Sequence, residues 1–325
     1  MRSQSLFITS GCIFIAYIFI GLFALILGDE SLSLRQIYEA VLGKDELLST
    51  IIFDLRMPRI IMAILIGMLL ASSGSITQTV FSNPIADPYI IGIASAATFG
   101  AVLAYVLKVP DVYFGFFGFV FCCFFALIIF KLSKRSNIAT LLIIGIAISS
   151  FLGAFTSFFI YYIGEDSFKV MAWLMGYLGL ASWSKVLILL VPLLFCLGFF
   201  YAHKNQLNII LSGDDEAKNL GVDAAKLKRN LLIVSSLAVS FGVAFSGLIG
   251  FVGLIVPHII RMMIKNYDNS LVLPLCTLLG GIFLLFCDTL ARVMLSPVEI
   301  PIGIITALFG APVFLFLALK ARTLL

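Results

Sequence analysis

The sequence has little charge. Of its 325 residues only 12% are charged, whereas 62% are hydrophobic. An ordinary soluble domain carries roughly a quarter charged residues. A soluble core could not bury so many apolar side chains, so the composition excludes a soluble globular protein and predicts that the lipid bilayer is the solvent.

The sequence also lacks the common motifs of catalysis. It contains no GxxxxGK[ST] phosphate loop, no HExxH pair and no GxSxG elbow. Its six cysteines fall inside apolar runs without CxxC spacing, which is typical of core packing. The net charge of +4 is spread over several loops, so no nucleic-acid partner is expected. We therefore expect no catalytic residue, metal site or cofactor in this chain.

Apolar runs of about 16 to 25 residues match helices that cross a hydrocarbon core about 30 Å thick. The sequence predicts ten spans: Leu6–Leu27, Ile60–Val80, Gly92–Leu107, Val112–Phe130, Ile138–Ile163, Val186–Tyr201, Leu231–Gly250, Leu254–Ile264, Leu271–Leu295 and Gly303–Leu319. The predicted fold is an all-α polytopic membrane protein, with residues 1–325 as one domain. The run 254–264 is too short to cross, so we expect it to continue from the glycine-rich turn before it or to be buried among other helices.

Basic residues predict the orientation of the chain. With the N-terminus inside, thirteen Lys and Arg fall on the inner side and eight on the outer side. This follows the positive-inside rule and predicts that both termini are cytoplasmic. Half of the outer basic residues lie in the loop Gly28–Arg59, where they could pair locally or bind an external partner. The acidic residues available in that loop are Asp29, Glu30, Glu39, Asp45, Glu46 and Asp54.

Two other polar segments have patterns of their own. The outer loop Gly164–Lys185 carries Trp173, Tyr177 and Trp183, which predicts a helix at headgroup level. The inner segment 203–230 predicts two short helices. Ser212-Gly213 and three acids form a helix start, Leu220-Gly221 forms its end, and a second helix is expected around Ala224–Arg229. A solvated connector is the simpler alternative for this segment.

Motifs along nearly the whole chain resemble those of FecCD-type permeases, the membrane subunits of ABC importers for ferric siderophores, haem and cobalamin. The matching motifs are Arg56-Met-Pro-Arg59, Gly74 with the run Phe81–Pro88, the segment Ser212–Val222, the segment Gly247–Arg261, and Pro297–Gly303 with Gly310-Ala-Pro312. Ser212 departs mildly from the pattern, because an apolar residue is expected there.

The resemblance implies a type II importer, with a permease dimer, two ATPase subunits that hold ATP and magnesium, and a substrate-binding protein. It implies import of an iron chelate (ferric siderophore or haem) or cobalamin. By resemblance, the ATPase-coupling residues are Ser212, Gly213, Asp214, Asp215, Glu216, Ala217, Leu220 and Gly221. The residues implied to dock the binding protein are Arg56, Arg59 and Arg292.

Small and polar residues inside the spans allow several interpretations. Gly67, Ala71, Gly74 and Gln78 share one helix face, which favours close helix packing, with Gln78 either capping that face or facing a pore. Asp288 and Arg292 have the spacing of an ion pair. The candidates for lining the pore are Gln78, Ser149, Gly153 and Thr156.

Three other function classes compete with the ABC permease. One is a purely structural or scaffold membrane protein, against which the short helix expected in 203–230 argues. An ion-coupled secondary transporter of a small hydrophilic solute would usually place ionisable residues in mid-span, and Asp288 is the clear candidate. An intramembrane enzyme would need a nucleophile or base that the motifs do not supply. Pro257-His258 is typical of a helix kink rather than of a metal site. Which chelate is carried, and whether the dimer pairs two copies or two homologous chains, stay open from the sequence.

Overall fold

The computed structural model describes residues 2–28, 31–110, 113–133 and 138–322, all of it helical or irregular and without strands. Asp29 and Glu30 of the predicted outer loop, and the first residue of the predicted span 112–130, lie outside these ranges. The main helices are α1 (Arg2–Ile26), α4 (Met57–Val80), α5 (Ile93–Val106), α6 (Phe114–Leu132), α7 (Ile138–Ile163), α9 (Trp183–Ala202), α12 (Ala224–Ser246), α13 (Val252–Ile264), α14 (Asn269–Val293) and α15 (Ile302–Arg322). These helices follow the predicted spans in order.

The apolar helices differ in length. Among the described residues six helices are long and apolar enough to cross a membrane, and four shorter apolar stretches lie in α1, α5, α13 and α15. These helices confirm a multi-pass, all-α membrane protein.

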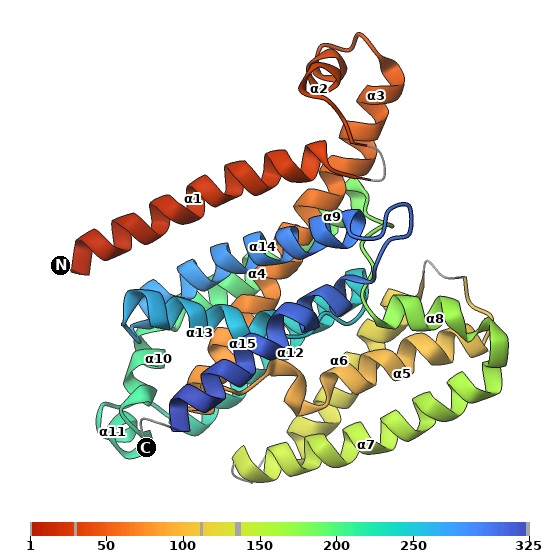
Figure 1. Cartoon of the computed structure of the whole chain (residues 1–325). Coiled ribbons are helices and arrows are strands. Elements are labelled where there is room, and N and C mark those ends of the chain that lie inside the picture. The colour runs from red at the N-terminus through yellow and green to blue at the C-terminus, as the bar shows by residue number, and fades with distance from the viewer. Residues whose placement is uncertain (1, 29–30, 111–112, 134–137, 323–325) are drawn as a thin grey trace.

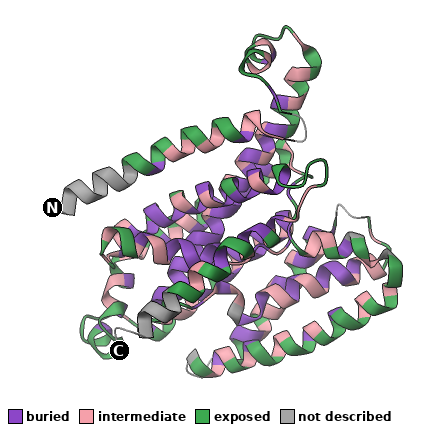
Figure 2. Ribbon diagram, in the orientation of Figure 1, coloured by how far each residue is buried: buried purple, intermediate pink, exposed green. Residues whose placement is uncertain are grey.

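Helix α4 lies at the centre of the molecule. The most apolar window of its helical stretch is 83% buried, against 22% for the corresponding window of α7. Figure 2 shows this contrast between the central helices and α7. Close approach depends on glycine: a Cβ on Gly67 would lie 2.2 Å from Gly280 O, and one on Gly74 would lie 1.9 Å from Gly253 O. The predicted packing role of this face is confirmed.

Helices α5, α6 and α7 form a second group beside the α4 core (Figure 1). Phe99 of α5 meets Phe121, Phe125, Phe155 and Phe159 of α6 and α7, with ring centroids 5.3 to 6.5 Å apart. Edge and tilted contacts at these distances are favourable between aromatic rings. This side of the molecule combines aromatic packing with close approaches at small residues, since a Cβ on Gly100 of α5 would lie 2.6 Å from Phe117 O of α6.

The predicted outer loop Gly28–Arg59 is largely helical, which corrects the sequence interpretation. Helix α2 (Leu34–Val41) has a capping box between Ser33 and Gln36, and α3 (Glu46–Thr50) continues through the π-helical turn η1 (Ile51–Arg56) into α4. The second span therefore begins before Ile60. The hydropathy pattern missed this start because the polar residues in the first turns of the helix resemble those of a loop. Figure 1 shows α2 and α3 projecting from one end of the molecule.

The other polar segments are confirmed in part. In the outer segment, the turn η4 (Gly164–Asp166) leads into α8 (Ser167–Leu174), so a short helix is present there. In the inner segment, α11 (Asp214–Asn219) is the predicted short helix, but α10 (Lys204–Leu211) was not predicted. The second predicted helix is the first part of α12, so the seventh span begins at Ala224 rather than Leu231.

Helix α13 is short because the chain before it is unwound. Residues 247–251 connect α12 to α13 without helical structure, with positive φ at Gly247 (71°) and Phe251 (68°). A short irregular backbone is tolerated at membrane depth where protein surrounds it. Helix α13 is indeed buried against α4 and α14, which confirms the second of the two predicted alternatives for residues 254–264.

Candidate functional site

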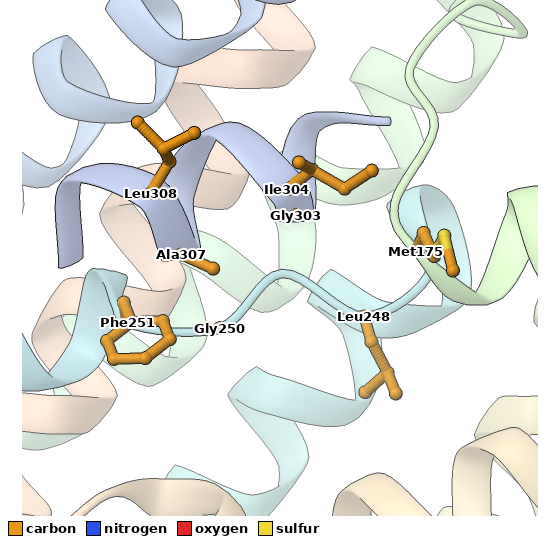
Figure 3. Close-up of a pocket in the computed structure, with 8 residues that line it drawn as sticks. All are labelled: Met175, Leu248, Gly250, Phe251, Gly303, Ile304, Ala307 and Leu308. Carbon is orange, nitrogen blue, oxygen red and sulfur yellow. The ribbon is translucent and has the colours of Figure 1, made fainter. Parts of the chain in front are cut away.

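The unwound linker 247–251 forms one wall of a hollow of about 570 Å³. Figure 3 shows the lining residues, which come from three segments that are far apart in the sequence. They are Met175 after α8, Leu248, Gly250 and Phe251 of the linker, and Gly303, Ile304, Ala307 and Leu308 of α15. None of these side chains is charged or a hydrogen-bond donor, so the hollow offers shape and apolar contact rather than ligands.

Backbone hydrogen bonds hold the three segments together. Tyr177 N donates to Ser246 O at 2.8 Å, and Gly303 N donates to Met175 O at 2.9 Å. A Cβ on Gly303 would lie 2.4 Å from Met175 O, so only glycine allows this approach. In the linker itself, Ile249 O accepts from the Tyr89 hydroxyl at 3.2 Å, so a neighbouring segment supplies one partner for the unwound backbone.

Helices α10 and α11 lie at the end of the molecule opposite α2 and α3 (Figure 1). All residues of α11 are exposed except Ala217, and the apolar Leu220 just after it is 64% exposed. Gly213 precedes the helix with φ 118° and Gly221 follows it with φ 78°. The predicted glycine stop is confirmed. No side chain caps the N-terminus, however, because the N-cap position is Gly213 itself and not Ser212.

One ion pair fixes α11 to the body of the protein. Lys228 Nζ, in the first turns of α12, lies 2.5 Å from Asp214 Oδ1. Ala217 is the one buried residue of α11 and packs its methyl group into the hydrophobic core. The helix is therefore a short rigid projection that covers little core of its own.

Of the three arginines implied to dock a binding protein, Arg56 and Arg292 are buried and Arg59 is half-buried. Arg59 donates to Asp288 from both Nε (3.1 Å) and Nη2 (3.0 Å), and its Nη1 donates to Glu299 at 2.6 Å. Arg292 lies 3.3 Å from Asp288, which confirms the predicted pair. Within the loop Gly28–Arg59, Arg35 pairs locally with Glu39 at 2.8 Å, whereas Arg59 pairs with Asp288 and Glu299 outside the loop.

Backbone carbonyls complete the surroundings of these arginines. Arg292 Nη1 donates to Leu27 O at 3.0 Å, and Arg56 Nη1 donates to Ile26 O at 3.1 Å. The guanidinium groups thus secure the carboxyl end of α1, which has orphan acceptors there. A docking role for these arginines stays a prediction, since a partner would have to compete with these internal contacts.

The candidate pore residues do not line the hollow. Gln78 is 2% exposed and donates to Leu254 O at 2.9 Å, so it caps the packed face of α4. On α7, Ser149 is half-buried and lies beside Gly92, and Thr156 is buried and donates to Leu152 O at 2.8 Å. Gly153 is half-buried, with no atom within 4 Å of an added Cβ. The structure brings none of the four together, and their lining of a pore stays a prediction.

Sequence reasoning missed the residues of the hollow because apolar side chains carry no chemical signal. The one available sign was the density of glycine in the stretch 247–253, which reads GLIGFVG. Glycine inside an apolar run often marks an unwound or closely approached backbone. His258 is half-buried, and the described part of the chain contains no group of three or more His, Cys, Asp or Glu residues that could hold a metal ion.

The cysteines are free among the described residues. Four are buried as predicted for core packing, Cys123 is half-buried and Cys12 is exposed. Cys12 is therefore an exception to the core-packing prediction.

Comparison with known proteins identifies the class. The family model described as the FecCD transport family matches residues 15–320. The cobalamin import system permease protein BtuC of Halobacterium salinarum is 40% identical over 281 residues, which is 85% of this chain and 75% of that protein. The hemin transport system permease protein HmuU of Yersinia pestis is 37% identical, with 96% and 95% covered.

A solved structure agrees with this match. It is described as an inward-facing conformation of a metal-chelate type ABC transporter, and it superimposes with a TM-score of 0.87 at 34% identity, covering 96% of this chain and 99% of that one. The match decides between the competing classes in favour of a transporter permease and against an enzyme. The chain belongs to the FecCD transport family and is a membrane permease of the ABC importer type.

Proposed function

We propose that this chain is one half of a permease dimer that imports an iron chelate, such as a ferric siderophore or haem, or cobalamin. Two separate ATPase subunits bind ATP and magnesium below it, and a substrate-binding protein delivers the cargo from outside. The chain itself holds no cofactor. Both termini lie on the cytoplasmic side of a cytoplasmic (inner) membrane.

The observation that carries this proposal is the shape and exposure of α11. A six-residue helix with three exposed acids, followed by an exposed leucine, adds little to the stability of the chain. A surface of this kind is expected where a soluble partner binds. The resemblance assigns that partner as the ATPase, and the absence of a phosphate loop in this sequence requires the ATPase to be another polypeptide.

The hollow supports a large cargo over a bare ion. A small ion needs polar ligands to replace its water, and the eight lining residues of the hollow supply mainly apolar surface and no polar side chain. Relatives named for cobalamin and for hemin are similar to this chain at 40% and 37% identity. Both cargoes are large macrocyclic metal complexes, which is consistent with an apolar route.

Replacing Leu220 with Asp tests the coupling assignment. The change puts a charge on a side chain that is 64% exposed, so the permease should still fold. We expect the ATPase to co-purify less and the ATP-driven uptake to fall by roughly tenfold, the equivalent of about 1.4 kcal/mol of lost interaction.

Leu47→Asp is the matched control. Leu47 is 71% exposed on α3, at the opposite end of the molecule. The ATPase should co-purify with this variant as with the unaltered protein. If Leu220→Asp retained the ATPase and transported normally, the coupling role of α11 would be wrong.

A further inference from the structure

The inner ends of four helices are joined by polar side chains, three of them buried and two half-buried, that the function proposed above does not use. The side chains are Asn208 of α10, Asn269 of α14, Thr79 and Gln78 of α4, and Arg261 of α13. Thr79, Gln78 and Asn269 are at most 2% exposed. Polar groups are costly to bury unless each finds a partner, so the arrangement of their contacts is informative.

The first contacts connect α10 to α14. Asn208 Nδ2 donates to Asp268 Oδ1 at 2.7 Å, and Asn208 Oδ1 accepts from the backbone and side-chain nitrogens of Asn269 at 2.8 and 2.9 Å. Asp268 in turn caps α14 by accepting from Ser270 N at 2.9 Å. The start of α14 therefore follows α10, the helix directly before α11.

The next contact connects α14 to α4, and its donor, the Thr79 hydroxyl, has two acceptors within reach. Thr79 Oγ1 lies 3.3 Å from Asn269 Oδ1 and 2.9 Å from Ser75 O. A hydroxyl has one proton, so Thr79 donates to one of these acceptors at a time. A small shift of α14 along α4 would exchange one hydrogen bond for the other without leaving a buried donor unsatisfied.

The last contacts connect α4 to the unwound linker through α13. Arg261 Nη2 donates to Thr79 Oγ1 at 3.3 Å, and Arg261 Nη1 donates to Gln78 Oε1. Gln78 Nε2 donates to Leu254 O at 2.9 Å and to Gly253 O at 3.4 Å. Those two carbonyls belong to the first turn of α13, immediately after the linker that lines the hollow.

The charge of Arg261 is held by neutral acceptors only. Within the described ranges no carboxylate lies at ion-pair distance from it, in contrast to Arg59, which has Asp288 and Glu299. Breaking a buried ion pair is strongly destabilising, whereas neutral contacts exchange more easily. The outer end of α4 is therefore fixed, while its inner end has contacts that can rearrange.

We infer that the side chains of Asn208, Asn269, Thr79, Arg261 and Gln78 form a relay that carries movement of α10 and α11 to the linker 247–251. They are positioning residues, since none lines the hollow or belongs to the exposed surface of α11. The inference rests on the proposed coupling of α10 and α11 to an ATPase. It adds the route by which that coupling reaches the hollow.

Thr79→Val tests the relay with little change in shape, because it replaces the hydroxyl by a methyl group. Thr277→Val is the matched control: Thr277 is a buried threonine of α14 whose hydroxyl donates only to Leu273 O of its own helix, at 2.9 Å. Backbone hydrogen–deuterium exchange is measured on the permease with its co-purified ATPase, with and without MgATP and vanadate.

In the unaltered complex, nucleotide should change the exchange of 204–219 and of 247–254. In Thr79→Val the change at 204–219 should persist, and the change at 247–254 should fall by about fivefold, within the range reported for residues along coupling networks. Thr277→Val should behave as the unaltered complex does. Thr79→Ser, which restores the hydroxyl, should restore the response.

A double variant adds an independent readout. If Asn208 and Thr79 act in series, Asn208→Ala combined with Thr79→Val should reduce the response at 247–254 no further than either change alone. Additive effects would overturn the relay. An unaltered response at 247–254 in Thr79→Val would also overturn it, with the coupling role of α11 intact. Absence of any nucleotide response at 204–219 in the unaltered complex would instead reject the proposed coupling, and the relay with it.

Discussion

At the residue scale, Asp288 shows what a buried carboxylate needs. It is fully buried in α14 and accepts two hydrogen bonds from Arg59, and Arg292 lies one turn further along the same helix. The Arg292 contact was predictable because residues four apart on a helix are neighbours. The Arg59 contact was not predictable, because it joins positions 229 residues apart.

Arg59→Ala should destabilise the protein strongly. Removing Arg59 leaves Asp288 and Glu299 without their main partner, and breaking a buried ion pair by removing one member costs about 3–5 kcal/mol. Thermal unfolding in detergent measures the loss. Arg35→Ala is the control, since it breaks an exposed pair with Glu39 and should cost at most about 1 kcal/mol. Equal stability of the two variants would contradict the structural role of Arg59.

At the element scale, glycines set the distance between α4 and its neighbours. Gly74 approaches Gly253, and Gly67 approaches Gly280, so closely that no side chain fits between the backbones. The spacing of small residues on α4 predicted such a face. It did not predict which helices would meet it, because that depends on how the chain folds back on itself.

Gly74→Ala should separate α4 from α13. The new Cβ would lie 1.9 Å from Gly253 O, and a backbone atom cannot move aside as a side chain end can. We expect a loss of at least about 3 kcal/mol, at the upper end of overpacking effects. Thermal unfolding provides the measurement.

Gly198→Ala on α9 is the contrasting variant. An added Cβ at Gly198 meets no atom within 4 Å, and alanine in a helix interior is favoured over glycine by about 1 kcal/mol. This variant should be as stable as the unaltered protein or slightly more so. A similar loss in both variants would show that the close approach at Gly74 does not matter.

The two short helices of the inner segment, α10 and α11, differ in how well the sequence predicts them. Helix α11 was predictable from its acids and glycine stop, which are local signals. Helix α10 was missed because it is only eight residues long, and two of its apolar residues, Leu207 and Ile210, are buried where α10 packs against α14 and α4. Tertiary packing stabilises such short helices more than propensity does.

At the scale of the whole molecule, the hollow depends on three chain segments meeting. Backbone hydrogen bonds join the chain after α8 to Ser246, which directly precedes the linker 247–251, and to the start of α15. Figure 3 shows Ala307 on the α15 wall, on the side of Phe251. A side chain added there would enter the space between the walls.

Ala307→Phe should therefore reduce transport without unfolding the protein. The hollow of about 570 Å³ has room for a benzyl group, but the cargo would meet it. We expect uptake to fall roughly tenfold, corresponding to about 1.4 kcal/mol of added barrier, with ATPase binding unchanged. Leu194→Phe is the control on the exposed face of α9. Normal uptake by Ala307→Phe would separate the hollow from the route of the cargo.

The sequence by itself determined the membrane location, the helical class and the order of the spans. These depend on the length and composition of apolar runs, which are local properties, and a helix must have both to cross the hydrocarbon core. It also determined α11 and the Asp288–Arg292 pair, which depend on residues within a few turns. Only the tertiary structure decided that Gln78 caps a packed face, that Arg59 pairs with Asp288, and that apolar residues around 175, 250 and 304 form a hollow. These features arise from contacts between distant segments, and the side chains that make them are no different in sequence from those of any other membrane helix.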